Sequence, residues 1–362
     1  MRTFLLLFVF LFPLLSNAQI ENIIVVTTDG FRWQEVFKGT DPVLVADKTY
    51  NQNDSAAIER MYGGKTAEEK RRKLLPFLWD TIAQKGQIYG NRAFGNKVDN
   101  SNPYWFSYPG YSEIFCGFVD SLINTNNYMA NPHTNVLAFI NRHDAFKGKV
   151  AAFAAWDAFD RILNETQSGI PVICGTDQCG LPTPDEQQQM LNAMKATGYN
   201  PFVKWGAQLD VYVHYPAMDY LKKKKPRVLY ISYGETDEWA HEGHYRDYLN
   251  AAHHVDEYLR EIWTFVQNDP QYKNKTALFI TVDHGRGDAV KPEWTSHNSK
   301  IADAHEMWFA VMGPGIPAKG EVKKPMQLWQ KQFAQTFTEL LGLTFTCEHP
   351  VAPGLKSVLM EK

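Results

Sequence analysis

The segment IIVVTTDG (residues 23–30) is an apolar run that ends in a carboxylate and a glycine. Four further short runs, at residues 150–155, 228–231, 277–282 and 308–312, are also apolar at nearly every position. Continuous apolar runs of this length are typical of strands that are buried on both faces of a mainly parallel sheet. The five runs therefore predict a central sheet that is covered on both sides.

Amphipathic helical patterns separate these runs. The clearest lies at residues 245–266, where apolar side chains recur every three or four positions along one stripe. Similar patterns occupy residues 74–83, 185–196 and 327–341. Because strands alternate with helices, we expect an α/β fold in the form of a three-layer sandwich around a largely parallel sheet.

The N-terminus has the pattern of a secretory signal peptide at residues 1–18. Arg2 supplies a positive charge, residues 4–15 form an apolar segment, and residues 16–18 (SNA) resemble a small-x-small cleavage site. The apolar segment is too short to span a bilayer. We therefore expect cleavage near Ala18, export to the periplasm or the medium, and no stable membrane insertion.

The composition narrows the classes of function. Hydrophobic residues make up 44% of the 362 residues and charged residues 21%, which is typical of a globular protein. The 37 basic and 40 acidic side chains give a formal charge of −3. With no excess of basic residues, a nucleic acid duplex is not an expected partner.

The four cysteines lack the paired spacing of a zinc ribbon. Cys174 and Cys179 flank a loop-like stretch that a disulfide would close, and an exported protein sits in an oxidising compartment. The alternative is that these residues, together with Cys116 and Cys347, are free thiols.

Acidic and histidine side chains follow three of the apolar runs. Asp29 follows the first run, Asp237 and His241 come shortly after the run at 228–231, and Asp283 and His284 follow the run at 277–282. In open α/β sheets, ligands bind at the carboxyl ends of the strands. Carboxylates and imidazoles are ligands of metals such as zinc, and residues four apart on a helix face the same side. The pattern predicts a metal site.

The motifs resemble those of the alkaline phosphatase superfamily, and within it the nucleotide pyrophosphatase/phosphodiesterase-like branch. They occur in the family's order and span residues 29–315, although residues 130–225 match nothing in it. The matching pieces are VVTTDGFR (25–32), SYPGYSEIFCG (107–117), D-x-x-x-H (237–241), DHG (283–285), His297 and GPG (313–315).

The resemblance implies two divalent metal ions, with zinc as the expected metal, bridged by the phosphate of a substrate. It also implies a nucleophile whose hydroxyl is activated by a metal, two residues before a proline, which is Ser107 here. The implied ligands are Asp237, His241 and His297 for the first ion, and Asp29, Asp283 and His284 for the second.

Two of these assignments have a competitor. Ser112, in a Ser-Glu pair, resembles the nucleophile of cofactor-independent phosphoglycerate mutases in the same superfamily. We favour Ser107, because its offsets to the following proline and glycine fit the phosphodiesterase pattern. His305 competes with His297. We favour His297, because its segment reads as a loop and its distance to the GPG motif is near the family's.

The resemblance also suggests substrate-binding residues. The family's phosphodiesterases place an asparagine some twenty residues after the nucleophile, which matches Asn127, or Asn126 with a one-residue gap. Arg286, after the DHG motif, is a second candidate for the phosphate. Monoesterases need further positive charge, for which Arg286, Arg92 and Lys97 are candidates.

The sequence thus predicts an exported two-metal hydrolase of phosphate esters, of phosphodiesterase or phosphatase type, with a small-molecule substrate. The alternatives are a sulfatase, a phosphotransferase or mutase, and a non-catalytic binding protein on the same fold. Tyr111 stands where a sulfatase would have an arginine. Because the implied ligands must converge on one site, we expect residues 19–362 to form a single metallohydrolase domain with a decorating insertion at about 130–225.

Overall fold

The computed structural model describes residues 20–359. The predicted signal peptide lies outside these residues, so its cleavage and the export that it implies stay predictions. Among the described residues, no helix combines the length and apolar character needed to cross a membrane.

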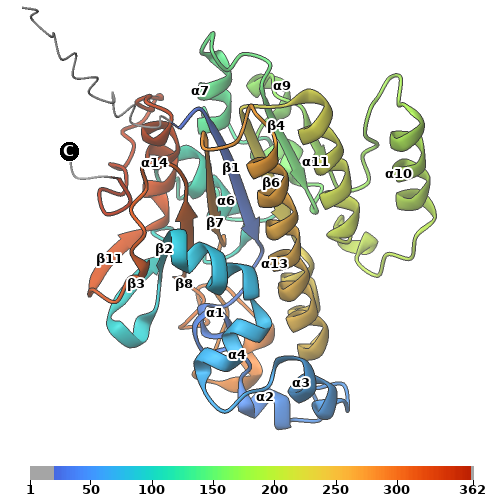
Figure 1. Cartoon of the computed structure of the whole chain (residues 1–362), viewed down its shortest axis with the longest axis vertical. Coiled ribbons are helices and arrows are strands. Elements are labelled where there is room, and N and C mark those ends of the chain that lie inside the picture. Colours follow the sequence, from blue (N-terminus) through green and yellow to red (C-terminus); the bar gives the residue numbers. More distant parts are fainter. Residues whose placement is uncertain (1–19, 360–362) are drawn as a thin grey trace, which may run out of the picture.

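The core is a sheet of eight strands in the order β10-β2-β9-β7-β1-β6-β4-β5 (Figure 1). Strand β9 runs antiparallel to its neighbours β2 and β7, whereas every other pair in the sheet is parallel. The strands are β1 (Asn22–Thr28), β2 (Gly86–Tyr89), β4 (Val150–Ala154), β5 (Val172–Cys174), β6 (Val228–Tyr233), β7 (Thr276–Thr281), β9 (Phe309–Met312) and β10 (Gly320–Glu321).

All five apolar runs form strands of this sheet, which confirms the predicted α/β fold with a largely parallel sheet. The strands that the sequence did not signal are β2, β5 and β10, which have two to four residues. A small second sheet has the order β11-β3-β8. Its strands are β3 (Asn96–Asp99), β8 (Glu306–Met307) and β11 (Met326–Trp329).

Helices cover both faces of the sheet, as β6 shows. Tyr230 packs against Phe115 and Phe159, and Tyr233, three positions on, packs against His214 and Tyr258. Residues an odd number apart on a strand face opposite sides. One layer therefore contains α6 (Ser107–Cys116) and α8 (Phe159–Ile162), and the other contains α11 (Val211–Lys224) and α13 (Tyr245–Asn268).

The remaining helices lie around these layers. Helices α7 and α14 pack with α6, and α4 contacts both α1 and α13. Their bounds are α1 (Trp33–Lys38), α2 (Pro42–Ala46), α3 (Ser55–Tyr62), α4 (Ala67–Leu74), α5 (Ala83–Lys85), α7 (Val136–Arg142), α9 (Glu165–Ser168), α10 (Glu186–Thr197), α12 (Glu235–His241) and α14 (Phe333–Leu340).

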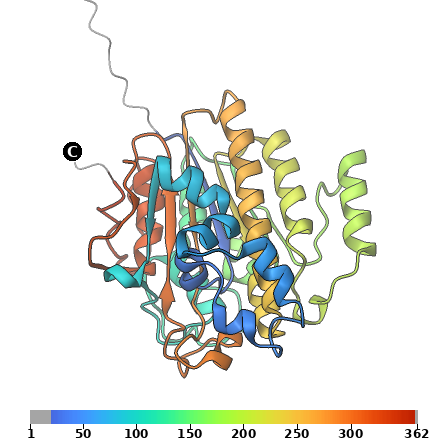
Figure 2. The ribbon, with the colours of Figure 1, turned by 60° about the horizontal axis from the view of Figure 1, so that its bottom comes forward.

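Two helical patterns turn out differently from the prediction. The pattern at 327–341 begins with strand β11, and its helix is α14 alone, because Met326–Trp329 pairs with β3. The pattern at 185–196 forms α10, but none of its residues is buried. Figures 1 and 2 both show α10 at the edge of the molecule, and it packs beside α11.

The segment 130–225, expected to decorate the core, contributes in part to the core itself. Strands β4 and β5 extend the sheet beyond β6, and α11 packs on β4 and β6. The part around α10 is peripheral. All four cysteines are free thiols, so the structure follows the second alternative for Cys174 and Cys179.

Candidate metal centre

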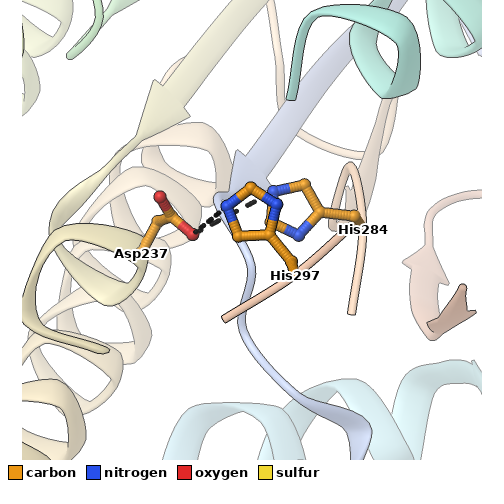
Figure 3. A group of neighbouring side chains, drawn as sticks. All are labelled: Asp237, His284 and His297. Atoms are coloured by element: carbon orange, nitrogen blue, oxygen red, sulfur yellow. Dashed lines mark ion pairs between the residues drawn. The ribbon is translucent and has the colours of Figure 1, made fainter. Parts of the chain in front are cut away.

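The carboxyl ends of three neighbouring strands bring the predicted ligands together. Strand β1 lies between β6 and β7 and is parallel to both. Asp29 follows β1, helix α12 with Asp237 follows β6, and Asp283 and His284 follow β7. Figure 3 shows Asp237 reaching the same point as His284 and His297.

Three fully or largely buried side chains form the first cluster. Asp29 Oδ1 and Asp283 Oδ2 each lie 3.3 Å from His284 Nε2. Within residues 20–359, neither oxygen has a hydrogen-bond partner. Burial and a neighbouring carboxylate raise the pKa of both aspartates. Burial opposes the charged form of His284, but Asp283 and Asp29 outweigh it and raise its pKa to about 9.

Neighbouring groups fix the orientation of these side chains. The Tyr111 hydroxyl donates to Asp29 Oδ2 over 2.9 Å, so Oδ1 is left facing the cluster. His284 Nδ1 lies 2.9 Å from the carbonyl oxygen of Gly285. A hydrogen bond there places the proton of the neutral ring on Nδ1, so that Nε2 is the nitrogen available to a metal.

Gly30 allows the two clusters to approach each other. Its N–H donates to Asp283 Oδ1 over 3.1 Å. Its φ is +57°, and a Cβ there would lie 2.7 Å from Asp237 Oδ1. Any other residue would therefore displace the side chains of Asp237, Arg286 or His284.

The second cluster joins Asp237 to three histidines. Asp237 Oδ1 lies 3.6 Å from His297 Nε2 and 4.0 Å from His284 Nε2. The two histidine rings stack with their centroids 3.9 Å apart. His241 Nε2 lies 3.1 Å from Asp237 Oδ2 and 2.9 Å from His297 Nε2. Burial alone would raise the pKa of Asp237, but His241, Arg286 and His297 hold it well below its ordinary value.

The six predicted ligands thus lie at one place, whereas His305 lies outside it. Its Nδ1 is 2.8 Å from the carbonyl of Ala302, and its ring packs beside Trp105. Ser107, the first residue of α6, has its Oγ 3.3 Å from His284 Nε2. Ser112 accepts instead from Asn131 Nδ2 over 3.0 Å, away from the cluster.

Comparison with known proteins finds a family model and several solved structures that resemble this chain. Residues 211–303 match a family model described as "Metalloenzyme superfamily". The structure resembles the lipoteichoic acid synthase LtaP from Listeria monocytogenes, with a TM-score of 0.57, 12% identity and coverage of 94% of this chain and 76% of that one. It also resembles the alkaline phosphatase PafA (TM-score 0.61, 10% identity, 94% and 99% coverage) and a 2-O GAG sulfatase (0.57, 14%, 92% and 73%).

The chain has the fold of the alkaline phosphatase superfamily. No curated protein sequence matches it. The fold and the superfamily resemblance predicted from the sequence are thereby confirmed.

In this alkaline-phosphatase-like fold, a cavity of about 700 Å³ lies against the two clusters. We call the side formed by Asp29, Ser107, Asp237, His241 and His297 the inner wall. Asp283 and His284 lie behind it and do not line the cavity.

Asn126 and Asn127 both line the cavity, but they differ in how they are held. Asn126 Oδ1 accepts from the N–H of Tyr108 over 3.0 Å, which fixes its amide beside the start of α6. Asn127 is exposed. The geometry therefore favours Asn126, the alternative that requires a one-residue gap relative to the family's spacing.

Arg286 is placed differently from the prediction. Its guanidinium is fully buried and donates to Asp237, to the carbonyl of Trp294 (2.8 Å) and to that of Thr295 (2.6 Å). It does not line the cavity. Arg286 thus holds the carboxylate of Asp237 in place. Its N–H groups are bonded to protein atoms and are not available to a substrate in the cavity.

The other two basic candidates also lie elsewhere. Arg92 pairs with Asp99 and lies 3.2 Å from Glu306, and Lys97 is exposed on β3. Neither lines the cavity.

A second group of residues that line the cavity was not foreseen. We call it the outer wall, and it is formed by Trp156, Asp157, Arg161, Lys204 and Trp205. The N–H of Asp157 donates to Gly206 over 2.9 Å, which ties the second half of this wall to the end of β4. The rule that ligands gather at strand ends would have pointed to Trp156 and Asp157, but nothing local marks Lys204 or Trp205.

Proposed function

We propose that this chain is an exported, metal-dependent hydrolase of phosphate esters with Ser107 as its nucleophile. The observation that carries the proposal is the position of Ser107 Oγ, 3.3 Å from His284 Nε2 and at the base of a cavity. The hydroxyl of Ser107 is thus next to a cluster of carboxylates and imidazoles that suits a divalent metal.

The donor set fits metal ions for a physical reason. Two buried carboxylate oxygens, on Asp29 and Asp283, have no hydrogen-bond partner among the described residues and face each other across His284. Such an arrangement is costly unless a cation lies between the groups. The mixture of histidine nitrogens and carboxylate oxygens suits zinc.

We assign the ligands as the superfamily resemblance implies. Asp237, His241 and His297 would hold the first ion, and Asp29, Asp283 and His284 the second. Asp29 groups with Asp283 and His284, and Asp237 groups with His284 and His297, so that His284 belongs to both groups and lies between the two proposed sites. His241 Nε2 lies 3.1 Å from Asp237 Oδ2, next to the group of the first ion.

The charges favour a phosphodiester. The three aspartates contribute three negative charges, and the buried Arg286 offsets one of them. Two divalent ions would leave a surplus of two positive charges. A deprotonated Ser107 and a singly charged phosphodiester would neutralise this surplus, whereas a monoester carries one negative charge more.

Bound metal ions supply two effects, a lowered pKa for the nucleophilic hydroxyl and stabilisation of charge that develops on the phosphate. Ser107 Oγ then attacks phosphorus, the bond from Oγ to phosphorus forms, and the bond from phosphorus to the alcohol oxygen breaks. In a second step, water attacks the phosphorus of this serine phosphodiester, the bond from phosphorus to Oγ breaks, the phosphate monoester leaves and Ser107 regains its proton. The Asn126 amide is held where its NH₂ group can donate to a phosphate oxygen.

The test uses the purified full-length chain and three substrates. Metal content is measured by elemental analysis, and turnover is measured on bis-p-nitrophenyl phosphate, p-nitrophenyl phosphate and p-nitrophenyl sulfate. We expect two zinc ions per chain and the highest kcat/KM on the diester. Calcium with sulfate turnover would indicate a sulfatase, and absence of metal and turnover would indicate a binding protein.

A further inference from the structure

A carboxylate outside the metal centre, Glu113, is fully buried in α6, six residues after Ser107. It accepts from the N–H groups of Ser101 (2.8 Å), Asn102 (2.8 Å) and Lys331 (3.0 Å), and from Asn102 Nδ2 (2.9 Å). Both of its oxygens are thus occupied by donors from two other segments. An ionised carboxylate has only acceptor atoms, so it can accept all four of these hydrogen bonds.

Asn102, which Glu113 holds in place, in turn bonds to the residues that precede Ser107. Its Oδ1 accepts from the N–H of Tyr104 over 3.0 Å and of Trp105 over 3.1 Å. Trp105 has a φ of +53°, a left-handed conformation that is uncommon for any residue except glycine. Strained backbone of this kind persists only where surrounding contacts enforce it. The turn that leads into Ser107 is therefore held by Asn102, and Asn102 by Glu113.

The same buried network reaches Asp283, a residue of the first cluster. Asn100 Nδ2 donates to the carbonyl of Asp283 over 2.7 Å and to Gln330 Oε1 over 2.6 Å. Gln330 Nε2 donates to the same Asp283 carbonyl over 2.8 Å, and its neighbour Lys331 donates to Glu113. The loop before the nucleophile and the strand end that carries Asp283 thus share one framework.

We propose that Glu113 and Asn102 are positioning residues that fix Ser107 Oγ against the Asp283–His284 strand end. This inference rests on the proposed function, because it assigns their effect to the attack by Ser107. Displacement of a nucleophile by about 1 Å costs on the order of 100-fold in rate. Neither residue lines the cavity, so substrate binding should be unaffected.

The experiment compares Glu113→Gln and Asn102→Ala with a matched control. In the glutamine variant an NH₂ group replaces one acceptor and faces N–H donors, and in the alanine variant the bonds to Tyr104 and Trp105 are lost. Asp256→Asn is the control, because Asp256 is a buried carboxylate that accepts from the N–H groups of Phe77 (2.6 Å) and Leu78 (2.8 Å), away from the cavity.

We expect kcat to fall about 100-fold in both test variants while KM and zinc content stay at the wild-type level. The rate at which a fluorophosphonate labels Ser107 should fall in parallel. The control should lower the melting temperature and leave kcat unchanged. If Glu113→Gln does not fold, Asn102→Ala decides.

Wild-type kcat in a folded Asn102→Ala or Glu113→Gln variant, with Ser107 still required for turnover, would refute this inference alone. An equal loss of kcat in Asp256→Asn would also refute it, because the effect would then be a general loss of packing. Turnover that does not require Ser107 would refute the proposed function as well.

Discussion

The inner and outer walls of the cavity are built in different ways. The inner wall and the residues behind it come from the ends of β1, β6 and β7, which neighbour one another in the sheet, from the start of α6, and from the loop of His297. Part of the outer wall, Lys204 and Trp205, belongs to the segment between α10 and α11. The inner wall is thus held mainly by the strands of the sheet, whereas part of the outer wall belongs to a connecting segment. We infer that the inner wall carries the chemistry and the outer wall carries the choice of substrate.

The largest expected effect is that of Ser107→Ala. Loss of the nucleophile should lower kcat on the order of 10⁴-fold or more, as in other hydrolases that use a serine. Ser112→Ala is the control, because its hydroxyl bonds with Asn131 and not with the cluster. Near-normal turnover in the Ser107 variant, or a large loss of turnover in the Ser112 variant, would contradict the assignment of Ser107 as the nucleophile.

The second effect concerns stability and metal together. Burial and Asp29 raise the pKa of Asp283 well above its ordinary value, so its ionised form is less stable in the folded metal-free protein than in the unfolded chain. Asp283→Asn should therefore raise the melting temperature of metal-free protein. In the wild type, zinc at about 100 times its Kd should add about 2.7 kcal/mol to the unfolding free energy. The variant should lose most of this gain.

Differential scanning fluorimetry with and without a chelator measures both quantities. The sign depends on pH, because a raised carboxylate pKa destabilises the folded state only above the ordinary value and the cost grows as the pH rises. The advantage of the variant should accordingly shrink as the pH is lowered. An equal response to zinc in both proteins would mean that Asp283 is not a ligand.

A third effect separates the two asparagines. Asn126→Ala removes an amide that is fixed at the start of α6, and we expect kcat to fall about 100-fold, the loss typical of one donor to a transition-state oxygen. Asn127→Ala should stay close to the wild type, since that side chain is exposed. The reverse order in kcat would restore the assignment to Asn127.

The smallest effect is expected on the outer wall. Trp205 is 58% exposed and lines the cavity, so its indole offers a free apolar face. Trp205→Ala should lower kcat/KM about threefold to tenfold for bis-p-nitrophenyl phosphate, and less for methyl p-nitrophenyl phosphate, which has one ring fewer. Trp329→Ala is the control, because Trp329 is 37% exposed on β11 and lies outside the cavity. An equal loss of kcat/KM on both substrates would mean that Trp205 of the outer wall does not distinguish between them.

The sequence predicts the inner wall better than it predicts the outer wall. The apolar runs at 23–26, 228–231 and 277–282 predict buried strands of one parallel sheet, and a carboxylate or histidine that follows each run is then expected at one edge of that sheet. Such local patterns locate Asp29 and Asp283. The position of Arg286 was not predictable, because its burial depends on Asp237 and on two carbonyl groups of a short 3₁₀ helix (Lys291–Thr295) that no sequence pattern indicated.

The outer wall escaped prediction for a related reason. Lys204 and Trp205 lie beside the metal centre only because backbone hydrogen bonds tie their segment to the end of β4, as between Gln208 and Ala155 (2.9 Å). Contacts of this kind join segments far apart in sequence and leave no pattern in either. The helix α10 shows the opposite case, since its pattern predicts a helix correctly although no residue of it is buried.

The central claim is that Ser107 attacks phosphorus, and a covalent intermediate tests it most directly. The zinc-loaded protein is mixed with bis-p-nitrophenyl phosphate, quenched in acid within milliseconds, digested and analysed by mass spectrometry. We expect a nitrophenyl phosphoryl group on the peptide that contains residues 107–112, with fragmentation placing it on Ser107. A group on Ser112, or rapid turnover with no modified peptide, would contradict the claim.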